Sequence, residues 1–277
     1  MNPFPEYSEL FEGRLQLAVE LAQQAGNLTR DRYFQTDQYQ TERKRDNSPV
    51  TTADKEAEQC IRQALGVRFP DDGILGEEFG TVEGATRYQW VIDPIDGTKS
   101  FISGVPLYST LVGVTYQGES VAGVIYIPCL REIIFAAKGY GAWYSQQERP
   151  WRRSYVSKVE NLSDGLFVTS QVDNFAKRGA GEAYLALEKG AYISRSWGDG
   201  YGYLLVATGR AEAMVDPIVS PWDVAAIQPI IEEAGGKCTS WRGEFTIHGG
   251  DCVGSNGLVH ATVLQSLGSS SPQFHPT

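Results

Sequence analysis

The sequence contains few of the side chains that bind transition metals or form disulfides. Its 277 residues include 4 cysteines and 3 histidines, and no CxxC pair or Cys/His metal spacing occurs. The cysteines are far apart in the chain, at Cys60, Cys129, Cys238 and Cys252. We therefore expect reduced, partly buried thiols in a cytoplasmic protein, and neither a zinc site nor a disulfide framework.

Excess basic charge and long apolar runs are also missing. Lys and Arg number 24 against 34 Asp and Glu, so the formal net charge of −10 disfavours a nucleic-acid partner. No apolar run approaches the length of a membrane span, and the first residues, MNPFPEYSEL, lack the basic and apolar regions of a signal peptide. We expect a cytoplasmic protein without a membrane partner. A small phosphorylated metabolite stays compatible with the charge, because a bound divalent cation reverses the local field.

The composition supports a large core, since 42% of the residues are hydrophobic. A polar stretch over 146–164 divides the chain. We predict an N-terminal α+β subdomain over 1–145 and a C-terminal α/β subdomain over 146–267. The last residues, GSSSPQFHPT, are polar and rich in Ser and Pro, which predicts a disordered tail over 268–277.

Hydrophobic periodicity predicts both helices and strands. Helical spacing covers 7–33, and Thr51 or Thr52 is placed to cap a second helix over 54–67. Strands are predicted over 109–114 and 121–127, joined by a Gln117-Gly118 turn, and over 132–137. In the second half we predict strands over 166–169, 191–194 and 211–215, and helices over 179–189, 201–208 and 222–234, the last closed by Gly235-Gly236.

The segment WVIDPIDGTKSF, residues 90–101, places two carboxylates where a strand ends. Residues 90–92 are typical of a buried strand, and Pro94 and Gly97 prevent its simple continuation. Asp93 and Asp96 therefore lie in a turn, where two close carboxylates repel each other unless a proton or cation lies between them. The alternative is an ordinary solvated turn, which such dipeptides form far more often than a site.

Other acidic residues also stand at the ends of predicted elements. They are Asp54, the pair Glu77 and Glu78, and Asp223. Each alone is compatible with a solvated surface charge. If they bind metal together, their hard oxygen ligands favour Mg²⁺ or Mn²⁺ over Zn²⁺.

Three motifs together resemble the inositol monophosphatase family. They are Gly76-Glu77-Glu78, Asp93-Pro94-Ile95-Asp96-Gly97-Thr98 and Trp222-Asp223-Val224-Ala225-Ala226, in the order found in that family, and the resemblance covers nearly the whole chain. It implies a magnesium-dependent, lithium-sensitive phosphomonoesterase, related in fold to fructose-1,6-bisphosphatase. The implied fold is a layered α-β-α-β-α sandwich of the α+β class, the sugar phosphatase fold, with metals at the junction of the halves. It also implies a homodimer.

The resemblance assigns roles to the residues of these motifs. Metal ligands would be the side chains of Glu77, Asp93, Asp96 and Asp223 and the carbonyl of Ile95, holding two or three Mg²⁺, with Mn²⁺ a possible substitute. Thr98 would orient or deprotonate the attacking water, and Asp54 and Glu77 would assist it. Lys44 lies in the basic run 43–45, where a site residue and a solvated charge are equally compatible.

Phosphate and substrate contacts follow in part from the same motifs. If a helix begins after Gly97, the backbone N–H groups of Gly97 and Thr98 form an anion cradle. The segment from Arg195 to Tyr203, RSWGDGYGY, resembles the histidinol-phosphate phosphatase branch of the family. The branch would make Arg195, Asp199, Asp216 and Asp223 substrate contacts, with Asp199 and Asp216 receiving the ammonium and imidazole groups.

The implied reaction is hydrolysis of L-histidinol phosphate to L-histidinol and phosphate, a step of histidine biosynthesis. Inositol-1-phosphate and phosphoadenosine phosphatases are alternatives, with Asp216 binding ring hydroxyls in the first. A non-catalytic phosphate-binding protein belongs to another class, which the complete acidic set disfavours. Asp199 is equally compatible with a helix cap, and Tyr203 is more typical of a core residue.

Overall fold

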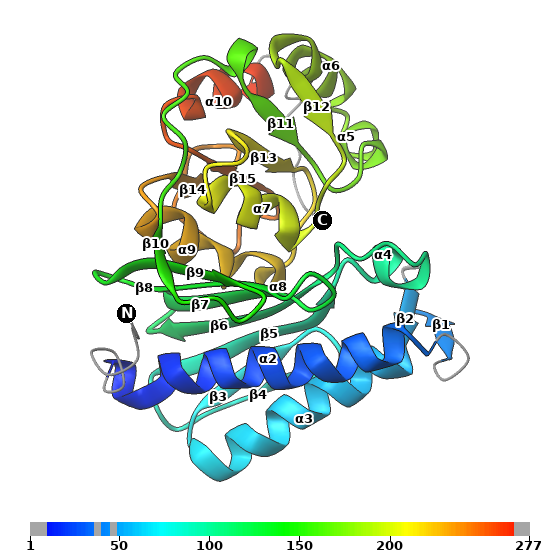
Figure 1. Ribbon diagram of the computed structural model, residues 1–277, viewed down its shortest axis with the longest axis vertical. Coiled ribbons are helices and arrows are strands. Elements are labelled where there is room, and N and C mark those ends of the chain that lie inside the picture. The colour runs from blue at the N-terminus through cyan, green and yellow to red at the C-terminus, as the bar shows by residue number, and fades with distance from the viewer. Residues whose placement is uncertain (1–9, 36–39, 45–48, 269–277) are drawn as a thin grey trace.

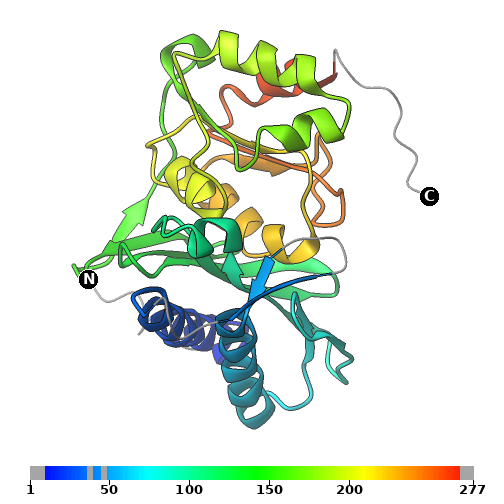
Figure 2. The ribbon, with the colours of Figure 1, turned by 90° about the vertical axis from the view of Figure 1, so that its right-hand side faces the viewer.

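The computed structural model describes residues 10–35, 40–44 and 49–268. Its elements stack in five layers, helices alternating with two sheets (Figure 1). The view turned by 90° shows the same order (Figure 2). This layering matches the α-β-α-β-α sandwich expected from the resemblance.

The larger sheet has eight strands in the order β10-β9-β8-β7-β6-β5-β3-β4. Neighbouring strands are antiparallel, except that β3 and β5 are parallel. The predicted strands at 109–114, 121–127 and 132–137 are confirmed, and the chain turns at Gln117-Gly118. The bounds are β3 Gly73–Gly76, β4 Gly80–Val82, β5 Tyr88–Asp96, β6 Ser109–Tyr116, β7 Glu119–Ile127, β8 Glu132–Ala137, β9 Gly141–Gln146 and β10 Arg152–Ser154.

Two helices, α2 (Arg14–Tyr33) and α3 (Thr52–Arg68), cover one face of this sheet (Figure 1). The predicted helix over 7–33 is partly wrong, because a 3-10 turn, η1 (Leu10–Gly13), precedes α2. Gly13 has a φ of 83°, and this left-handed backbone separates the turn from the α-helix. Residues 7–9 lie outside the described part of the chain.

The start of α3 follows the capping prediction. The hydroxyl of Thr51 accepts the N–H groups of Ala53 and Asp54, and the Asp54 carboxylate accepts the N–H of Thr51 at 2.8 Å. Before it, the short strands β1 (Thr41–Arg43) and β2 (Pro49–Thr51) form an antiparallel pair that the polar sequence did not predict. This pair brings Lys44 to the edge of the sandwich, beside the turn that follows β3.

The smaller sheet has five strands in the order β12-β11-β13-β15-β14. The strands predicted over 166–169, 191–194 and 211–215 are present with shifted ends, and so are the helices predicted over 179–189 and 201–208. The elements are β11 Leu166–Val168, α5 Asp173–Lys177, α6 Gly181–Gly190, β12 Ile193–Arg195, α7 Gly200–Ala207, β13 Ala213–Asp216, β14 Lys237–Thr239, β15 Cys252–Ser255 and α10 His260–Gly268. Helices α5, α6 and α10 lie on its outer face (Figure 1).

The helix predicted over 222–234 is wrong as a single helix. It is divided into α8 (Pro221–Val224) and α9 (Ile227–Glu233). The break lies over two glycines that face each other across β6 and β7, Gly113 and Gly123. A Cβ on Gly123 would overlap the carbonyl of Ala226, so the main chain lies directly on the sheet there. The predicted Gly235-Gly236 cap is confirmed, because Gly235 has a φ of 91° and both N–H groups bond to carbonyls of α9.

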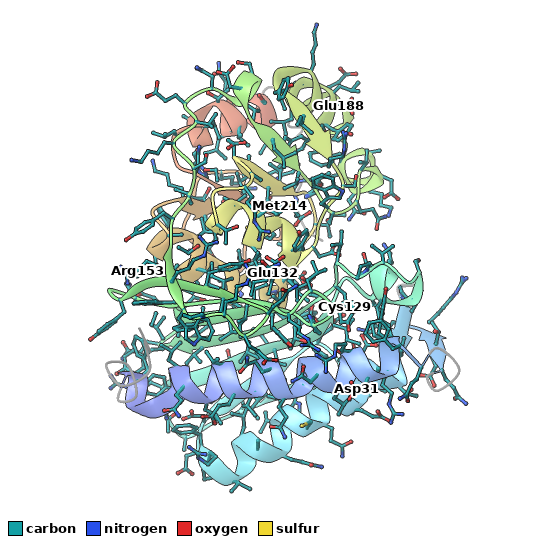
Figure 3. All side chains as sticks on the ribbon, in the orientation of Figure 1. Asp31, Cys129, Glu132, Arg153, Glu188 and Met214 are labelled. Carbon is teal, nitrogen blue, oxygen red and sulfur yellow. The ribbon has the colours of Figure 1, made fainter. Side chains whose placement is uncertain are left out.

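Side chains fill the spaces between the layers (Figure 3). One core packs α2 and α3 against the larger sheet, and another packs α7, α8 and α9 between the two sheets. Glu132 and Met214 lie in this central region, with Glu132 bound to Tyr144 and Arg210. The two halves of the chain therefore share a continuous apolar interface.

The sequence placed one boundary after residue 145 and another after residue 267. The larger sheet continues past residue 145, because β10 pairs with β9; the division into 1–145 and 146–267 stays a prediction. Gly268, where the tail was expected to begin, is instead the last residue of α10, and 269–277 lie outside the described residues. No helix in the described part of the chain is both long and apolar enough to span a bilayer.

The four cysteines are free thiols, as expected. Cys60 and Cys129 are partly buried, whereas Cys238 and Cys252 are fully buried, contrary to the expectation of partial burial. Their sulfur atoms lie 3.6 Å apart because β14 and β15 are paired.

Candidate active site

A bulge in β5 brings Asp93 and Asp96 to one face of the sheet. Residues three apart on a regular strand face opposite sides. Here Asp93 pairs with Leu111 and Asp96 with Ser109, so three residues of β5 span two of β6. The strand was expected to end before Asp93, but it continues to Asp96 through this irregularity. The carbonyl of Pro94 at the bulge accepts the Thr110 hydroxyl at 2.9 Å, which anchors the distorted backbone.

Asp223 joins these two aspartates from the second half of the chain. It lies in the first turn of α8, and its carboxylate accepts the N–H of Ser220 at 2.7 Å. One carboxylate oxygen from each of Asp93, Asp96 and Asp223 lies within 4.8 Å of the others. Because α8 is held by the close contact at Gly113 and Gly123, the position of Asp223 depends on the packing of helix on sheet.

The pKa values of the triad are raised. Burial, and then the charge of Glu77, raises the pKa of Asp93. Burial, and then the charge of Asp199, raises the pKa of Asp96, although Ser109 and the N–H of Gly200 donate to its carboxylate at 2.6 and 2.5 Å. Burial raises the pKa of Asp223 to about 7. Carboxylates gathered in this way require a proton or a cation between them.

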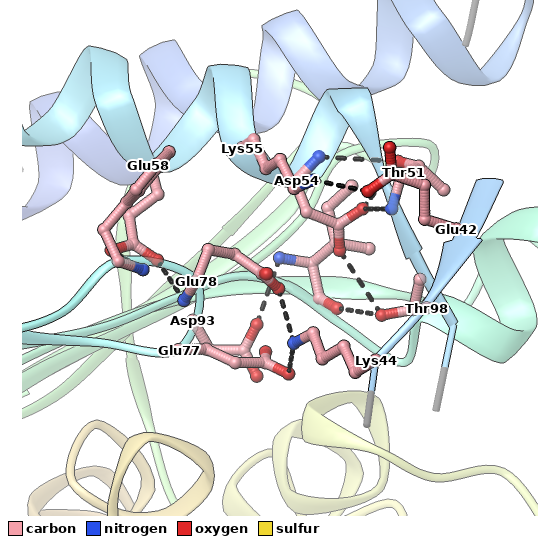
Figure 4. A network of polar contacts seen from close by, with 12 residues as sticks. Glu42, Lys44, Thr51, Asp54, Lys55, Glu58, Glu77, Glu78, Asp93 and Thr98 are labelled. Carbon is pink, nitrogen blue, oxygen red and sulfur yellow. Dashed lines mark hydrogen bonds and ion pairs between the residues drawn. The ribbon is translucent and has the colours of Figure 1, made fainter. Parts of the chain in front are cut away.

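Glu77 lies beside the triad, in the turn after β3, and is paired with a lysine. The Lys44 ammonium lies 2.6 Å from Oε1 of Glu77 and 2.7 Å from Oε1 of Glu78 (Figure 4). Burial lowers the pKa of Lys44, but the hydrogen bonds and charges of the two glutamates outweigh it and hold the pKa above its ordinary value. Burial raises the pKa of Glu78 to about 7. The structure thus places Lys44 against the acidic residues, a position that the sequence left open.

Thr98 connects the triad to Asp54. Its hydroxyl lies 3.4 Å from Oδ1 of Asp54 and 3.2 Å from the carbonyl oxygen of Ile95 (Figure 4). Burial raises the pKa of Asp54 to about 6, although hydrogen bonds from Thr51 oppose the shift. Asp54 is completely buried at the start of α3. The hydroxyl therefore faces a carboxylate that holds a proton more tightly than usual.

A cavity of about 290 Å³ opens between the two halves at these residues. Gly97 lines this cavity and has a φ of 91°. Helix α4 (Thr98–Ile102) begins directly after it, which meets the condition that the sequence set for an anion cradle. A side chain at Gly97 would also meet Asp199, since its Cβ would lie 2.6 Å from Oδ2. The cavity is lined by Lys44, Glu77, Asp93, Ile95, Asp96, Gly97, Thr98, Ser220, Trp222 and Asp223.

A second cavity of about 120 Å³ shares Asp96 and Asp223 with the first. It also contains Asp199 and Asp216. Burial, and then the charge of Asp216, raises the pKa of Asp199 to about 6. Burial likewise raises the pKa of Asp216, even though Ser170 donates to one of its oxygens. Four carboxylates from separate parts of the chain thus line one small space.

Tyr203 and Arg195 differ in their relation to this cavity. Tyr203 is buried, as the core reading predicted, and its hydroxyl also donates to Asp216 at 3.0 Å. Arg195 lies on the exposed end of β12, where it donates to the Ser194 carbonyl and its guanidinium lies 5.9 Å from the ring centre of Trp197. Neither cavity includes Arg195 in its described lining. Trp197 is 41% exposed.

Three residues that contact the acidic site were missed by sequence reasoning. Ser109 donates to Asp96, Ser170 donates to Asp216, and Glu58 accepts backbone N–H groups of the turn that carries Glu77. The serines carry no sequence signal. Glu58 has one, because it lies four residues after Asp54 and therefore on the same helical face.

The model of the inositol monophosphatase family matches residues 12–271. The chain belongs to the inositol monophosphatase family. A histidinol-phosphatase of Chlorobaculum parvum is 42% identical over 256 residues, covering 92% of this chain and 96% of that protein. A histidinol-phosphatase of Mycobacterium tuberculosis is 41% identical over 254 residues, covering 91% and 97%.

Solved structures agree with the fold. The extragenic suppressor protein suhB of Bartonella henselae superposes with a TM-score of 0.85 at 26% identity, covering 92% of this chain and 98% of that one. The predicted layered sandwich and the predicted family are therefore confirmed. This inositol monophosphatase-family chain is an enzyme of the phosphoric monoester hydrolase class. The family is metal-dependent, and the triad of Asp93, Asp96 and Asp223 is a compact acidic group of the kind that holds a metal.

Proposed function

We propose that this enzyme hydrolyses L-histidinol phosphate to L-histidinol and phosphate, using Mg²⁺. The observation that carries the proposal is the second cavity, whose Asp199 and Asp216 lie directly beside the acidic triad. A substrate with an ammonium close to its phosphate can bridge these two regions. The histidinol-phosphatases of Chlorobaculum parvum and Mycobacterium tuberculosis, similar over nearly their whole length, support this choice.

The residues of the larger cavity fit a hard divalent cation. Buried carboxylates with raised pKa values and no cysteine or histidine among them favour Mg²⁺ over Zn²⁺, with Mn²⁺ a possible substitute. Glu77, Asp93, Asp96 and Asp223 and the carbonyl of Ile95 would hold two or three such ions. Bound there, such ions would supply Lewis acidity, which would make a water molecule more acidic and neutralise charge on the ester oxygens.

Thr98 and Asp54 are proposed to orient the attacking water and to accept its proton. The Thr98 hydroxyl oxygen accepts a hydrogen bond from the water, and the Thr98 hydroxyl in turn donates a hydrogen bond to the Asp54 carboxylate, 3.4 Å away. Glu77 orients the water from the other side, once Lys44 no longer occupies its carboxylate. The N–H groups of Gly97 and Thr98 are positioned for the phosphate oxygens, and the open backbone at Gly97 allows close approach.

Substrate recognition is proposed to rest on charge and stacking. Asp199 and Asp216 receive the ammonium and imidazole groups, and Asp223 contacts the substrate where the two cavities meet. Trp197, exposed just after β12, packs on the imidazole ring. Arg195 lines neither cavity in the absence of substrate, and its proposed role is to contact the phosphate of a bound substrate or to order the acidic site. Residues 1–145 supply most metal ligands and residues 146–267 the substrate contacts.

The proposal also covers the location and oligomeric state of the protein. We propose a cytoplasmic, lithium-sensitive homodimer that acts in histidine biosynthesis on a small phosphorylated metabolite. The net charge of −10 disfavours a nucleic-acid or anionic membrane partner.

Inositol-1-phosphate is the second candidate substrate, because the Asp216 carboxylate is equally suited to accept hydrogen bonds from ring hydroxyls. Phosphoadenosine phosphate hydrolysis is a third.

Phosphate release separates these alternatives. The purified enzyme is given L-histidinol phosphate, inositol-1-phosphate or phosphoadenosine phosphate with Mg²⁺, and with EDTA as control. We expect the highest kcat/KM for L-histidinol phosphate, and a higher value for either other substrate would overturn the substrate choice. Asp93→Asn abolishes release if the acidic site is catalytic. A wild-type chain that binds phosphate without releasing it from any of the three would instead be a binding protein.

The second cavity has its own test. Asp199→Asn and Asp216→Asn remove the charges proposed to bind the ammonium, so KM for L-histidinol phosphate should rise about tenfold or more. Asp173→Asn, on exposed α5, is the matched control and should leave KM unchanged. An unchanged KM in both cavity variants would exclude this cavity as the ammonium site.

A further inference from the structure

Glu58 lies in the buried face of α3, directly beneath the turn that carries Glu77. Its side chain is fully buried. Oε2 accepts the backbone N–H of Glu78 at 2.7 Å (Figure 4), and Oε1 accepts that of Phe79 at 3.2 Å. Arg62, one helical turn later, donates to Oε1 at 2.7 Å and balances the charge. Both oxygens of this buried carboxylate therefore accept hydrogen bonds from the backbone of one short turn.

The same turn is closed against Glu58 on its other side. A Cβ on Gly76 would overlap Oε1 of Glu58, so the main chain at the end of β3 lies directly against the carboxylate. The N–H of Glu77 bonds to the carbonyl of Ile92 at 3.1 Å, which continues the parallel pairing of β3 with β5. Glu77 is thus held between two anchors, strand β5 before it and Glu58 after it.

These anchors decide where the two glutamate side chains point. The N–H groups of Glu78 and Phe79 point toward Glu58. The carboxylates of Glu77 and Glu78 point away from it, toward the Lys44 ammonium (Figure 4). Glu77 then lines the same cavity as Asp93, and the two side chains lie side by side (Figure 4). Without an acceptor at position 58, the N–H groups of Glu78 and Phe79 would lose their partner and the turn would be free to rotate.

We propose that Glu58 is a positioning residue of the metal site, which sets divalent-cation affinity by holding the Glu77 carboxylate beside Asp93. Among the described residues, Glu58 lines neither cavity, so it would act on a bound cation only by holding the turn that carries Glu77. The inference rests on the proposed metal-dependent function, of which it names a further determinant. Outer residues that orient metal ligands typically contribute 10- to 100-fold to metal affinity.

The test is Mg²⁺ binding to the metal-free protein, measured by isothermal titration calorimetry without substrate. In Glu58→Gln an amide nitrogen replaces one acceptor and faces a backbone N–H, so the dissociation constant should rise about 10-fold or more. Glu58→Asp keeps the charge but has a shorter reach, and should give an intermediate affinity. Glu56→Gln is the matched control, because Glu56 lies on the same helix and bonds to Arg32 instead of the turn.

A kinetic measurement separates positioning from general stability. In Glu58→Gln the Mg²⁺ concentration for half-maximal phosphate release should rise by the same factor, while kcat at saturating Mg²⁺ changes by less than about threefold. A lower melting temperature with wild-type Mg²⁺ affinity in both Glu58→Gln and Glu58→Asp would overturn the inference. If Glu58→Gln does not fold, Glu58→Asp alone decides. Absence of Mg²⁺ binding to the wild type would overturn the proposed function itself, and this inference with it.

Discussion

The Lys44 ammonium donates a hydrogen bond to Glu77, with Nζ 2.6 Å from Oε1. Glu78 accepts from the same ammonium at 2.7 Å, so one cation balances two adjacent carboxylates. Both glutamates belong to the acidic region where a metal is proposed to bind. The lysine therefore supplies positive charge to the metal-free protein at a place where a divalent cation would otherwise be needed.

Removing this ammonium should destabilise the metal-free protein. Lys44→Met leaves Glu77 and Glu78 facing each other without a counter-charge, a loss of about 1–3 kcal/mol. The melting temperature should fall by about 2–10 °C in EDTA, and saturating Mg²⁺ should remove most of the difference. Lys55→Met, which breaks the exposed pair with Glu42, is the control and should change it by less than about 2 °C. Equal melting temperatures for Lys44→Met and wild type in EDTA would contradict the prediction.

Loss of the Thr98 hydroxyl should affect catalysis far more than stability. Thr98→Val keeps the shape but removes the contacts to Asp54 and the Ile95 carbonyl, so kcat should fall about 100-fold or more. Thr98→Ser retains the hydroxyl and should remain within about tenfold of wild type. Thr115→Val removes a buried hydroxyl from β6, away from both cavities, and should leave kcat unchanged. A Thr98→Val enzyme with wild-type kcat would exclude the hydroxyl from proton handling.

The metal-free protein should lose stability as pH rises from about 4 to about 7. The pKa is raised to about 7 in Asp223 and to about 6 in Asp54, so the folded state binds these protons more tightly than the unfolded chain. Their stabilising contribution is complete below the unfolded pKa of about 4 and is lost progressively as pH rises to the folded values of about 6 and about 7. Thermal melts in EDTA across this range measure the effect.

The variant Asp223→Asn tests the same argument at a single residue. Removing the ionisable group should raise the melting temperature relative to wild type at about pH 8 and much less at about pH 5. Asp31→Asn, on the exposed side of α2 (Figure 3), should give no such pH-dependent difference. A constant offset between Asp223→Asn and wild type at all pH values would show that Asp223 titrates normally.

Gly123 should be intolerant of a side chain. A Cβ there would overlap the carbonyl of Ala226, so Gly123→Ala must displace the segment between α8 and α9. We expect a loss of about 1–3 kcal/mol or more in the free energy of unfolding, together with weaker Mg²⁺ binding, because Asp223 lies on α8. Gly66→Ala in α3 is the control, since nothing lies within 4 Å of its Cβ. That substitution should be neutral or stabilising by up to about 1 kcal/mol, and chemical denaturation compares the two.

Local chemistry in the sequence was sufficient for much of this structure. Thr51 and Asp54 determine where α3 begins, Gly97 where α4 begins, and Gly235 where α9 ends. Each depends on bonds between residues a few positions apart, which a sequence pattern records directly. The acidic motifs likewise indicated the family, because their order along the chain is itself specific.

Other features depend on contacts between distant segments, which periodicity does not record. The bulge at Pro94 aligns Asp93 with Asp96 only through its register with β6. The break between α8 and α9 requires the two glycines beneath it, and the exposed position of Arg195 depends on how β12 ends. Glu58, in α3, and Lys44, just after β1, both bond to the turn that carries Glu77, although they lie far from it in the sequence.

The sequence by itself thus determined the family and where many elements start and stop. The tertiary structure alone decided which carboxylates share a cavity, which cation balances them and which backbone groups hold them in place. The physical reason is that helix caps and turns depend on bonds between neighbours in the chain, whereas gathering like charges from strand, turn and helix depends on strand register and close packing between layers.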